Sequence, residues 1–160
     1  MNKSEAGFTL IEAMIVVAVS AILLAVTVPL SAFWTNRADI STAKGELSHG
    51  FGKAISLALR NEQALPIGEP AAALCLAPDN QLTVLEPSPS ELPNCSANTG
   101  NMVWRATIPE SISMSSNGNN VSCMCFNTAG LLTNNNCGGC SVTPTIDVGV
   151  GNEMDTVHVR

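Results

Sequence analysis

Residues 7–30 read GFTLIEAMIVVAVSAILLAVTVPL, and this stretch decides how the rest of the chain is interpreted. One carboxylate, Glu12, lies in an apolar run that contains no further ionisable group until Arg37. A charged side chain in hydrocarbon costs about 2.5 to 3.5 kcal/mol even on the lenient insertion scale. The sequence therefore indicates that Glu12 has a specific role.

The apolar run predicts a membrane-spanning helix. Residues 13–30 are apolar or small apart from Ser20 and Thr27, and as a helix they nearly span a bilayer core. A general secretory signal places its cleavage site after the apolar core. Here the small-residue break at Gly7 comes first, so cleavage there leaves the helix on the mature protein. On hydropathy alone, the alternative is an ordinary single-pass anchor with an uncleaved start.

The residues Gly7-Phe8-Thr9-Leu10-Ile11-Glu12 resemble the class III signal of the type IV pilin superfamily. The resemblance implies that a prepilin peptidase removes residues 1–7 as a leader and methylates the new amino terminus of Phe8. That amine and Glu12 would lie on one helix face. We expect Glu12 of an incoming subunit to pair with the Phe8 amine of a neighbour and fix the axial register in a filament.

The predicted fold class is α+β, with a long N-terminal helix packed on an antiparallel, disulfide-bonded sheet, as in the type IV pilin fold. Residues 8–35 form the membrane-spanning or filament-core half, residues 36–64 the amphipathic half, and residues 65–160 the β head. Helical spacing predicts a buried apolar stripe consisting of Ile40, Ala43, Leu47, Phe51, Ala54 and Ala58. Pro66 and Gly68 predict that the helix ends by about Gln63.

Two further expectations concern glycines and strands. Gly45, Gly50 and Gly52 weaken the helix and predict either close packing or bending there. Short β-like runs follow, with the clearest alternation in a terminal hairpin turned by residues 151–155 and a polar loop at residues 115–120. The predicted strands are residues 71–77, 81–85, 101–107, 121–126, 145–150 and 156–159.

All six cysteines lie in the head, at Cys75, Cys95, Cys123, Cys125, Cys137 and Cys140. An even number in a head outside the cytoplasm indicates disulfides, although six cysteines allow fifteen pairings. We expect Cys75 to pair with Cys95, and Cys123 and Cys125 to pair with Cys140 and Cys137 in nested bridges. The alternative is a four-thiolate zinc site, since C-x-C followed by C-x-x-C has ligand-like spacing.

No constellation in the sequence indicates catalysis, and we expect neither an enzyme nor a cofactor. His49 and His158 lack a nucleophile nearby in the sequence, and phosphate-binding, zinc-protease and nucleophile-elbow motifs are missing. Asp147, Glu153 and Asp155 flank a turn without the spacing of an EF-hand, so solvated turn carboxylates are expected there rather than a calcium site.

The charge balance argues against nucleic-acid binding. The chain has a formal net charge of −6, and from Leu65 onward the bases are Arg105 and Arg160 alone. Phosphate binding depends mainly on lysine and arginine contacts. The arginine-rich carboxy-terminal motif of DNA-binding FimT-type pilins is also missing.

Residues 54–62, AISLALRNE, and the runs around Trp104 and Phe126 are loosely similar to the GspH/FimT group of minor pilins. The resemblance implies a minor pilin of the FimU/FimT kind at the pilus tip, where it primes assembly for adhesion, twitching or DNA uptake. Its implied partners are other minor pilins, the major pilin, the prepilin peptidase and the inner-membrane assembly platform. The implied location is the inner membrane with a periplasmic head, then the pilus. The alternatives are a type II secretion pseudopilin, a major or DNA-binding pilin, and a membrane-tethered periplasmic binding protein.

Overall fold

The computed structural model describes residues 7–137 and 139–159, without the side chains at positions 26–32. The chain divides into two units, residues 1–36 and 37–160. Residues 1–6 of the predicted leader lie outside the described residues, as do seven side chains of the predicted membrane segment. Within the described part of the chain, no helix is long and apolar enough to cross a membrane.

The helix α1 (Leu10–Arg60) ends three residues before the predicted position. Asn61 adopts a left-handed backbone conformation with φ of 42°, which stops helix propagation. Its side-chain amide donates to the Leu65 carbonyl at 3.0 Å, and its Oδ1 accepts from the Leu65 amide at 2.8 Å. The helix is therefore ended by Asn61 and its own side chain, ahead of the proline.

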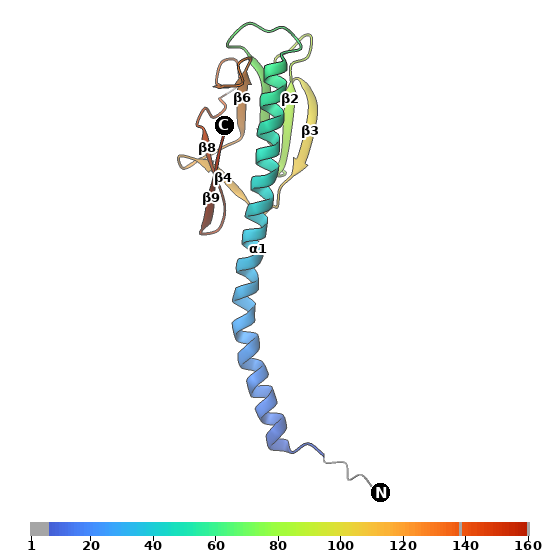
Figure 1. Ribbon diagram of the computed structural model, residues 1–160, viewed down its shortest axis with the longest axis vertical. Coiled ribbons are helices and arrows are strands. Elements are labelled where there is room, and N and C mark those ends of the chain that lie inside the picture. The colour runs from blue at the N-terminus through green and yellow to red at the C-terminus, as the bar shows by residue number, and fades with distance from the viewer. Residues whose placement is uncertain (1–6, 138, 160) are drawn as a thin grey trace. The chain divides into compact units, whose positions relative to one another are not determined.

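Two antiparallel sheets follow the helix and confirm the coarse α+β prediction (Figure 1). The first has the order β3-β2-β1-β6-β7, and the second has the order β5-β4-β8-β9. The strands of the first sheet are β1 (Pro70–Leu76), β2 (Gln81–Glu86), β3 (Asn101–Thr107), β6 (Cys123–Asn127) and β7 (Leu132–Thr133). Those of the second sheet are β4 (Ser113–Ser116), β5 (Asn119–Asn120), β8 (Thr145–Val150) and β9 (Glu153–His158).

Two local predictions are wrong. The predicted polar loop at residues 115–120 is a β4–β5 hairpin, because Asn117 and Gly118 both have positive φ and form its turn. The terminal hairpin turns at Gly151 and Asn152 alone, since Val150 pairs directly with Glu153. The acidic residues from Glu153 onward belong to β9, where an exposed edge strand tolerates charge.

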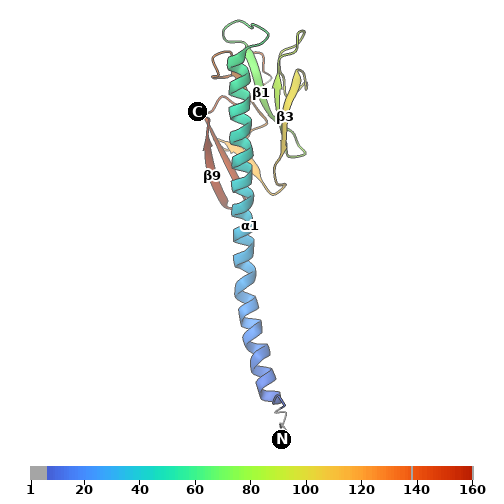
Figure 2. The same ribbon diagram turned by 45° about the vertical axis from the view of Figure 1, so that its right-hand side comes forward.

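The predicted helical stripe forms the centre of the core. All six stripe residues are buried, and Leu57 joins them. Phe51 meets Phe126 of β6 edge to face, with ring centroids 6.3 Å apart. Residues 37–60 of α1 lie against the strands, with β3 toward one side and β9 toward the other (Figures 1 and 2). The two sheets and this part of α1 thus share one core.

The structure distinguishes the three helix glycines. A Cβ added at Gly50 would lie 2.9 Å from Cδ1 of Leu74 and 3.3 Å from the Trp104 ring. Nothing lies within 4 Å of a Cβ built at Gly45 or Gly52. Close packing therefore explains Gly50, and it does not explain the other two.

Candidate processing and assembly site

The predicted cleavage bond between Gly7 and Phe8 lies outside regular structure. Residues 7–9 precede α1, and Phe8 is 77 % exposed. Exposed, irregular backbone is where proteolysis concentrates, because a protease must bind an extended chain. The bond is therefore accessible in this chain, two residues ahead of the first helical residue.

Thr9 caps the helix and accepts hydrogen bonds from the Glu12 amide. The Glu12 amide donates to Thr9 Oγ1 at 3.3 Å and to the Thr9 carbonyl at 3.1 Å. Thr9 and Glu12 have the spacing of a capping box, in which threonine is the N-cap and glutamate the third helical residue. This cap is not among the features predicted above from the sequence, although the Thr-x-x-Glu spacing is its recognised signal. Glu12 also favours the helix start through the macrodipole.

Glu12 itself is exposed, and no salt bridge joins it to a described residue. The described large apolar side chains of residues 10–24 are also exposed, each to at least 50 %: Leu10, Ile11, Met14, Ile15, Val16, Val17, Val19, Ile22, Leu23 and Leu24. They occupy all sides of the helix rather than one stripe. A helix that is apolar all round is covered by other protein or by lipid in its working state.

The head cysteines form three disulfides that match the expected pairing. Cys75 pairs with Cys95, Cys123 with Cys140, and Cys125 with Cys137, with Cα–Cα distances of 5.4, 4.7 and 6.4 Å. Cys123 and Cys125 alternate on β6 and face the same side of the sheet. The two bridges from β6 hold Cys140 and Cys137 against that side.

The zinc alternative would require the same sulfur atoms. Sγ atoms of Cys95, Cys123 and Cys140 lie within 4.8 Å of one another, as do those of Cys125, Cys137 and Cys140. Each of these atoms is bonded in a disulfide. A zinc ligand is a thiolate, so this oxidised cluster has no ligand to offer.

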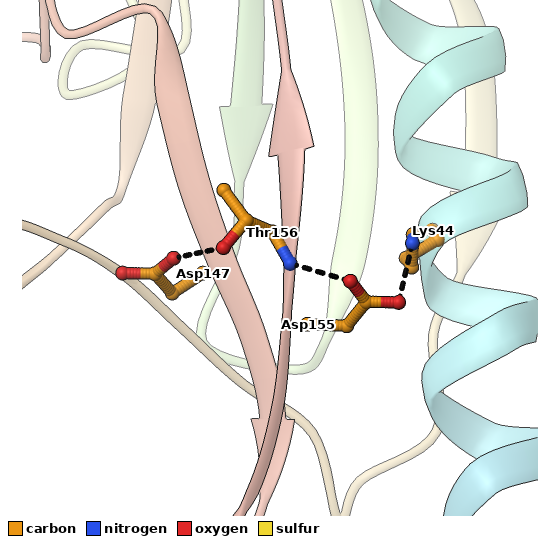
Figure 3. Close-up of polar contacts among 4 residues, drawn as sticks. All are labelled: Lys44, Asp147, Asp155 and Thr156. Carbon is orange, nitrogen blue, oxygen red and sulfur yellow. Dashed lines mark hydrogen bonds and ion pairs between the residues drawn. The ribbon is translucent and has the colours of Figure 1, made fainter.

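Two of the acidic residues near the turn, Asp147 and Asp155, lie in one chain of polar contacts with Lys44 and Thr156 (Figure 3). Lys44 Nζ donates to Asp155 Oδ2, and the Thr156 amide donates to Asp155 Oδ1 at 2.8 Å. Thr156 Oγ1 donates to Asp147 Oδ1 at 2.8 Å. The Lys44 hydrogen bond, then that from Thr156, lowers the pKa of Asp155. Asp147 and Asp155 thus bind their own neighbours.

The remaining candidates lie apart from these contacts. His49 is exposed on α1 and His158 is exposed on β9. Among the described residues, the groups of three potential metal ligands that come within 4.8 Å consist of cysteines, so the acidic residues near the β8–β9 turn form no such group.

Comparison with known proteins identifies the amino-terminal segment. Residues 2–28 match the family described as Prokaryotic N-terminal methylation motif. No curated protein and no solved structure matches the chain. The motif indicates a type IV pilin-like prepilin.

Proposed function

We propose that the chain is a minor type IV pilin, a structural rather than catalytic subunit incorporated at the pilus tip, where it helps to prime assembly. The observation that carries the proposal is the methylation motif at residues 2–28, joined to a compact disulfide-bonded head. A membrane-inserted start and a folded head are what a subunit needs if it is stored in a membrane and then moved into a filament. We further propose that it belongs to the GspH/FimT group of minor pilins.

The exposed apolar side chains of residues 10–24 support this proposal. In the precursor, lipid of the inner membrane would cover them, and in the filament the helices of neighbouring subunits would replace the lipid. The head would fold in the periplasm, where an oxidising environment maintains its three disulfides. Other minor pilins, the major pilin, the prepilin peptidase and the assembly platform are the proposed partners.

Glu12 has two separable roles under this proposal: it takes part in the helix cap, and its charge pairs with the Phe8 amine of a neighbour. Glu12→Gln retains a side chain suited to the capping box and removes the charge. Thr9→Ala retains the charge and removes the Thr9 Oγ1 acceptor. We expect Glu12→Gln and Glu12→Ala to insert in the membrane normally and to enter filaments poorly, and Thr9→Ala to enter them. Normal incorporation of both Glu12 variants would contradict the pairing.

The decisive experiment is quantitative mass spectrometry of sheared surface filaments, which measures the ratio of this chain to the major pilin and the mass of its first peptide. A trace amount that begins at methylated Phe8 is the expected result. A dominant amount would make it the major pilin. Processed protein that stays in the membrane and is missing from filaments would favour a pseudopilin or a tethered periplasmic protein.

Deletion of the gene distinguishes the proposed minor pilin from a type II secretion pseudopilin. The proposal predicts fewer surface pili with undiminished synthesis of the major pilin. Full piliation combined with a loss of protein secretion would instead identify a type II secretion pseudopilin.

A further inference from the structure

Strand β3 presents a free edge. It pairs with β2 on one side, and in the strand order of its sheet no described strand lies on the other. The three remaining edges among the described strands are shorter or acidic, since β7 and β5 have two residues each and β9 carries Glu153 and Asp155. β3 has seven residues, one charge and no proline, and Met102 and Val103 are 50 % and 36 % exposed. One β-bulge, at Val103, interrupts its pairing with β2, and the remainder of such an edge is a template for another strand.

A groove on the helix side of β3 adjoins this edge. It has a volume of about 450 Å³, and its lining is made by α1 and by β3. Trp104 and Val103 form one wall, and the small residues Ser48, Gly52 and Ser56 leave space on the helix. Lys53 and His49 also line the groove, and its lining contains no carboxylate.

A second groove lies on the opposite face of the same sheet. It has a volume of about 500 Å³, and Met102 and Arg105 bring β3 into its lining. Thr83 of β2 stands directly opposite Arg105, and Asn98 and Ser96 add polar groups from the loop around Cys95. Asp79 is the one carboxylate in the lining. The Arg105 guanidinium contacts Met102 Sδ at 3.3 Å.

The charges beside β3 contrast with the rest of the chain. Lys53 and Arg105 are exposed, and neither forms a salt bridge with a described residue. In a chain of net charge −6, these cations mark the edge as the place where an acidic segment is attracted rather than repelled. They lie in different grooves, on opposite faces of one strand.

We propose that β3 is the docking edge for an extended acidic segment of a partner subunit, which adds as a further strand of the sheet. Backbone hydrogen bonds would supply affinity, and alternate side chains of the added strand would enter the two grooves. Carboxylates at adjacent positions of that segment point to opposite faces, one toward Lys53 and one toward Arg105. The inference concerns residues 37–160 alone and goes beyond the proposed function.

The test uses purified full-length protein in detergent micelles and three synthetic seven-residue peptides. One peptide consists of valine and threonine with two adjacent central glutamates, the second has lysines at those positions, and the third keeps the glutamates beside a central proline. We expect the glutamate peptide to bind and to slow amide hydrogen exchange in residues 101–107. The lysine and proline peptides are expected to bind at least about tenfold more weakly.

Charge-reversal variants test whether the cation of each groove contributes to peptide binding. Lys53→Glu and Arg105→Glu are each expected to weaken binding of the glutamate peptide about tenfold. Arg60→Glu makes the same change in net charge at a site that lines neither groove, and it should leave binding unchanged.

Equal binding of the lysine peptide, or an unchanged exchange rate in residues 101–107, would overturn the proposal. Slowed exchange that rises with protein concentration in the absence of peptide would also overturn it, because a second copy would then occupy the edge. None of these results bears on processing at Gly7 or on Glu12, so failure here differs from failure of the proposed function.

Discussion

Strands β1 and β6 of the five-stranded sheet are buried on both faces, but by different means. On one face Leu74, Val84 and Phe126 pack against α1 as part of the main core. On the other, Ala73, Leu85 and the cysteines form a second small core. An antiparallel sheet commonly exposes one face to water. Here Cys137 and Cys140, each bonded to a cysteine of β6, cover part of the second face.

The two faces of the sheet are stabilised by different interactions. A 3.6-residue stripe on a long helix supplies many apolar contacts, so the first face is stabilised by packing. Cys137 and Cys140, which cover the second face, belong to the sequence NNNCGGC at positions 134–140, and asparagine and glycine offer little apolar surface to bury. Covalent bonds replace that missing surface, since a disulfide reduces the entropy of the unfolded chain.

The largest expected effect is on the helix-covered face. Phe126 is fully buried against Phe51, and Phe126→Ala should lower the free energy of unfolding by about 3 to 5 kcal/mol. Urea unfolding of the full chain in detergent, followed by circular dichroism, would measure the loss. Met154→Ala is the control, because Met154 is 71 % exposed and its loss should stay within about 0.5 kcal/mol. A loss below about 1 kcal/mol for Phe126→Ala would contradict this packing.

The next effect is on the disulfide-covered face. The double variant Cys123→Ser and Cys140→Ser opens a bridge that spans 17 residues, which should remove about 3 kcal/mol. The same urea experiment measures it, and mass spectrometry after thiol alkylation checks that the other two bridges remain. Stability equal to that of the unaltered chain would show that the Cys123–Cys140 bridge adds nothing to the stability of this face.

The sequence predicted the first face much better than the second. Helical spacing identified the stripe, and β-propensity gave the bounds of β3 and β8, because these are local signals. The burial of β1 and β6 on both faces depends on contacts between residues far apart in the chain, which no local pattern encodes. The nested spacing of the cysteines was the only local trace of the second core.

Two features that were not predicted, the β4–β5 hairpin and the helix cap, do have a recognisable sequence pattern. Asn117-Gly118 is a strong hairpin sequence, and Thr9-x-x-Glu12 has the spacing of a capping box. Both features could therefore have been predicted from the local sequence. The two grooves beside β3 had no such signal, since one arises where α1 meets β3 and the other where β3 meets β2 and the loop around Cys95.

A smaller effect tests how closely the helix approaches the first face. Gly50→Ala gains helix propensity but places a Cβ 2.9 Å from Leu74, and overpacking typically costs about 1 to 3 kcal/mol. We expect a net destabilisation of about 1 kcal/mol. Gly45→Ala and Gly52→Ala meet open space and should stabilise the chain by up to about 1 kcal/mol. Urea midpoints of the three variants, measured together, would show this difference in sign, and equal stabilisation by all three would refute the close approach.

The smallest effect concerns the contact that joins α1 to the second sheet at Lys44 and Asp155 (Figure 3). Because the Lys44 hydrogen bond lowers the pKa of Asp155 from its ordinary value of 3.8, the ionised carboxylate stabilises the folded chain. That contribution is fully present above pH 3.8 and is lost as the pH falls through the lower pKa of the folded state. Asp155→Asn should therefore lower the thermal midpoint slightly at pH 6, and the difference from the unaltered chain should disappear in strong acid.

Asp147→Asn provides the matched control for this contact. Asp147 accepts from the Thr156 hydroxyl and has no lysine partner in the described structure, so no comparable loss of a charge pair accompanies its substitution. The pH dependence of the midpoint should therefore follow that of the unaltered chain more closely for Asp147→Asn than for Asp155→Asn. Parallel curves for both variants would mean that the Lys44 contact does not hold the second sheet to α1 in solution, and that apolar packing in the shared core links them instead.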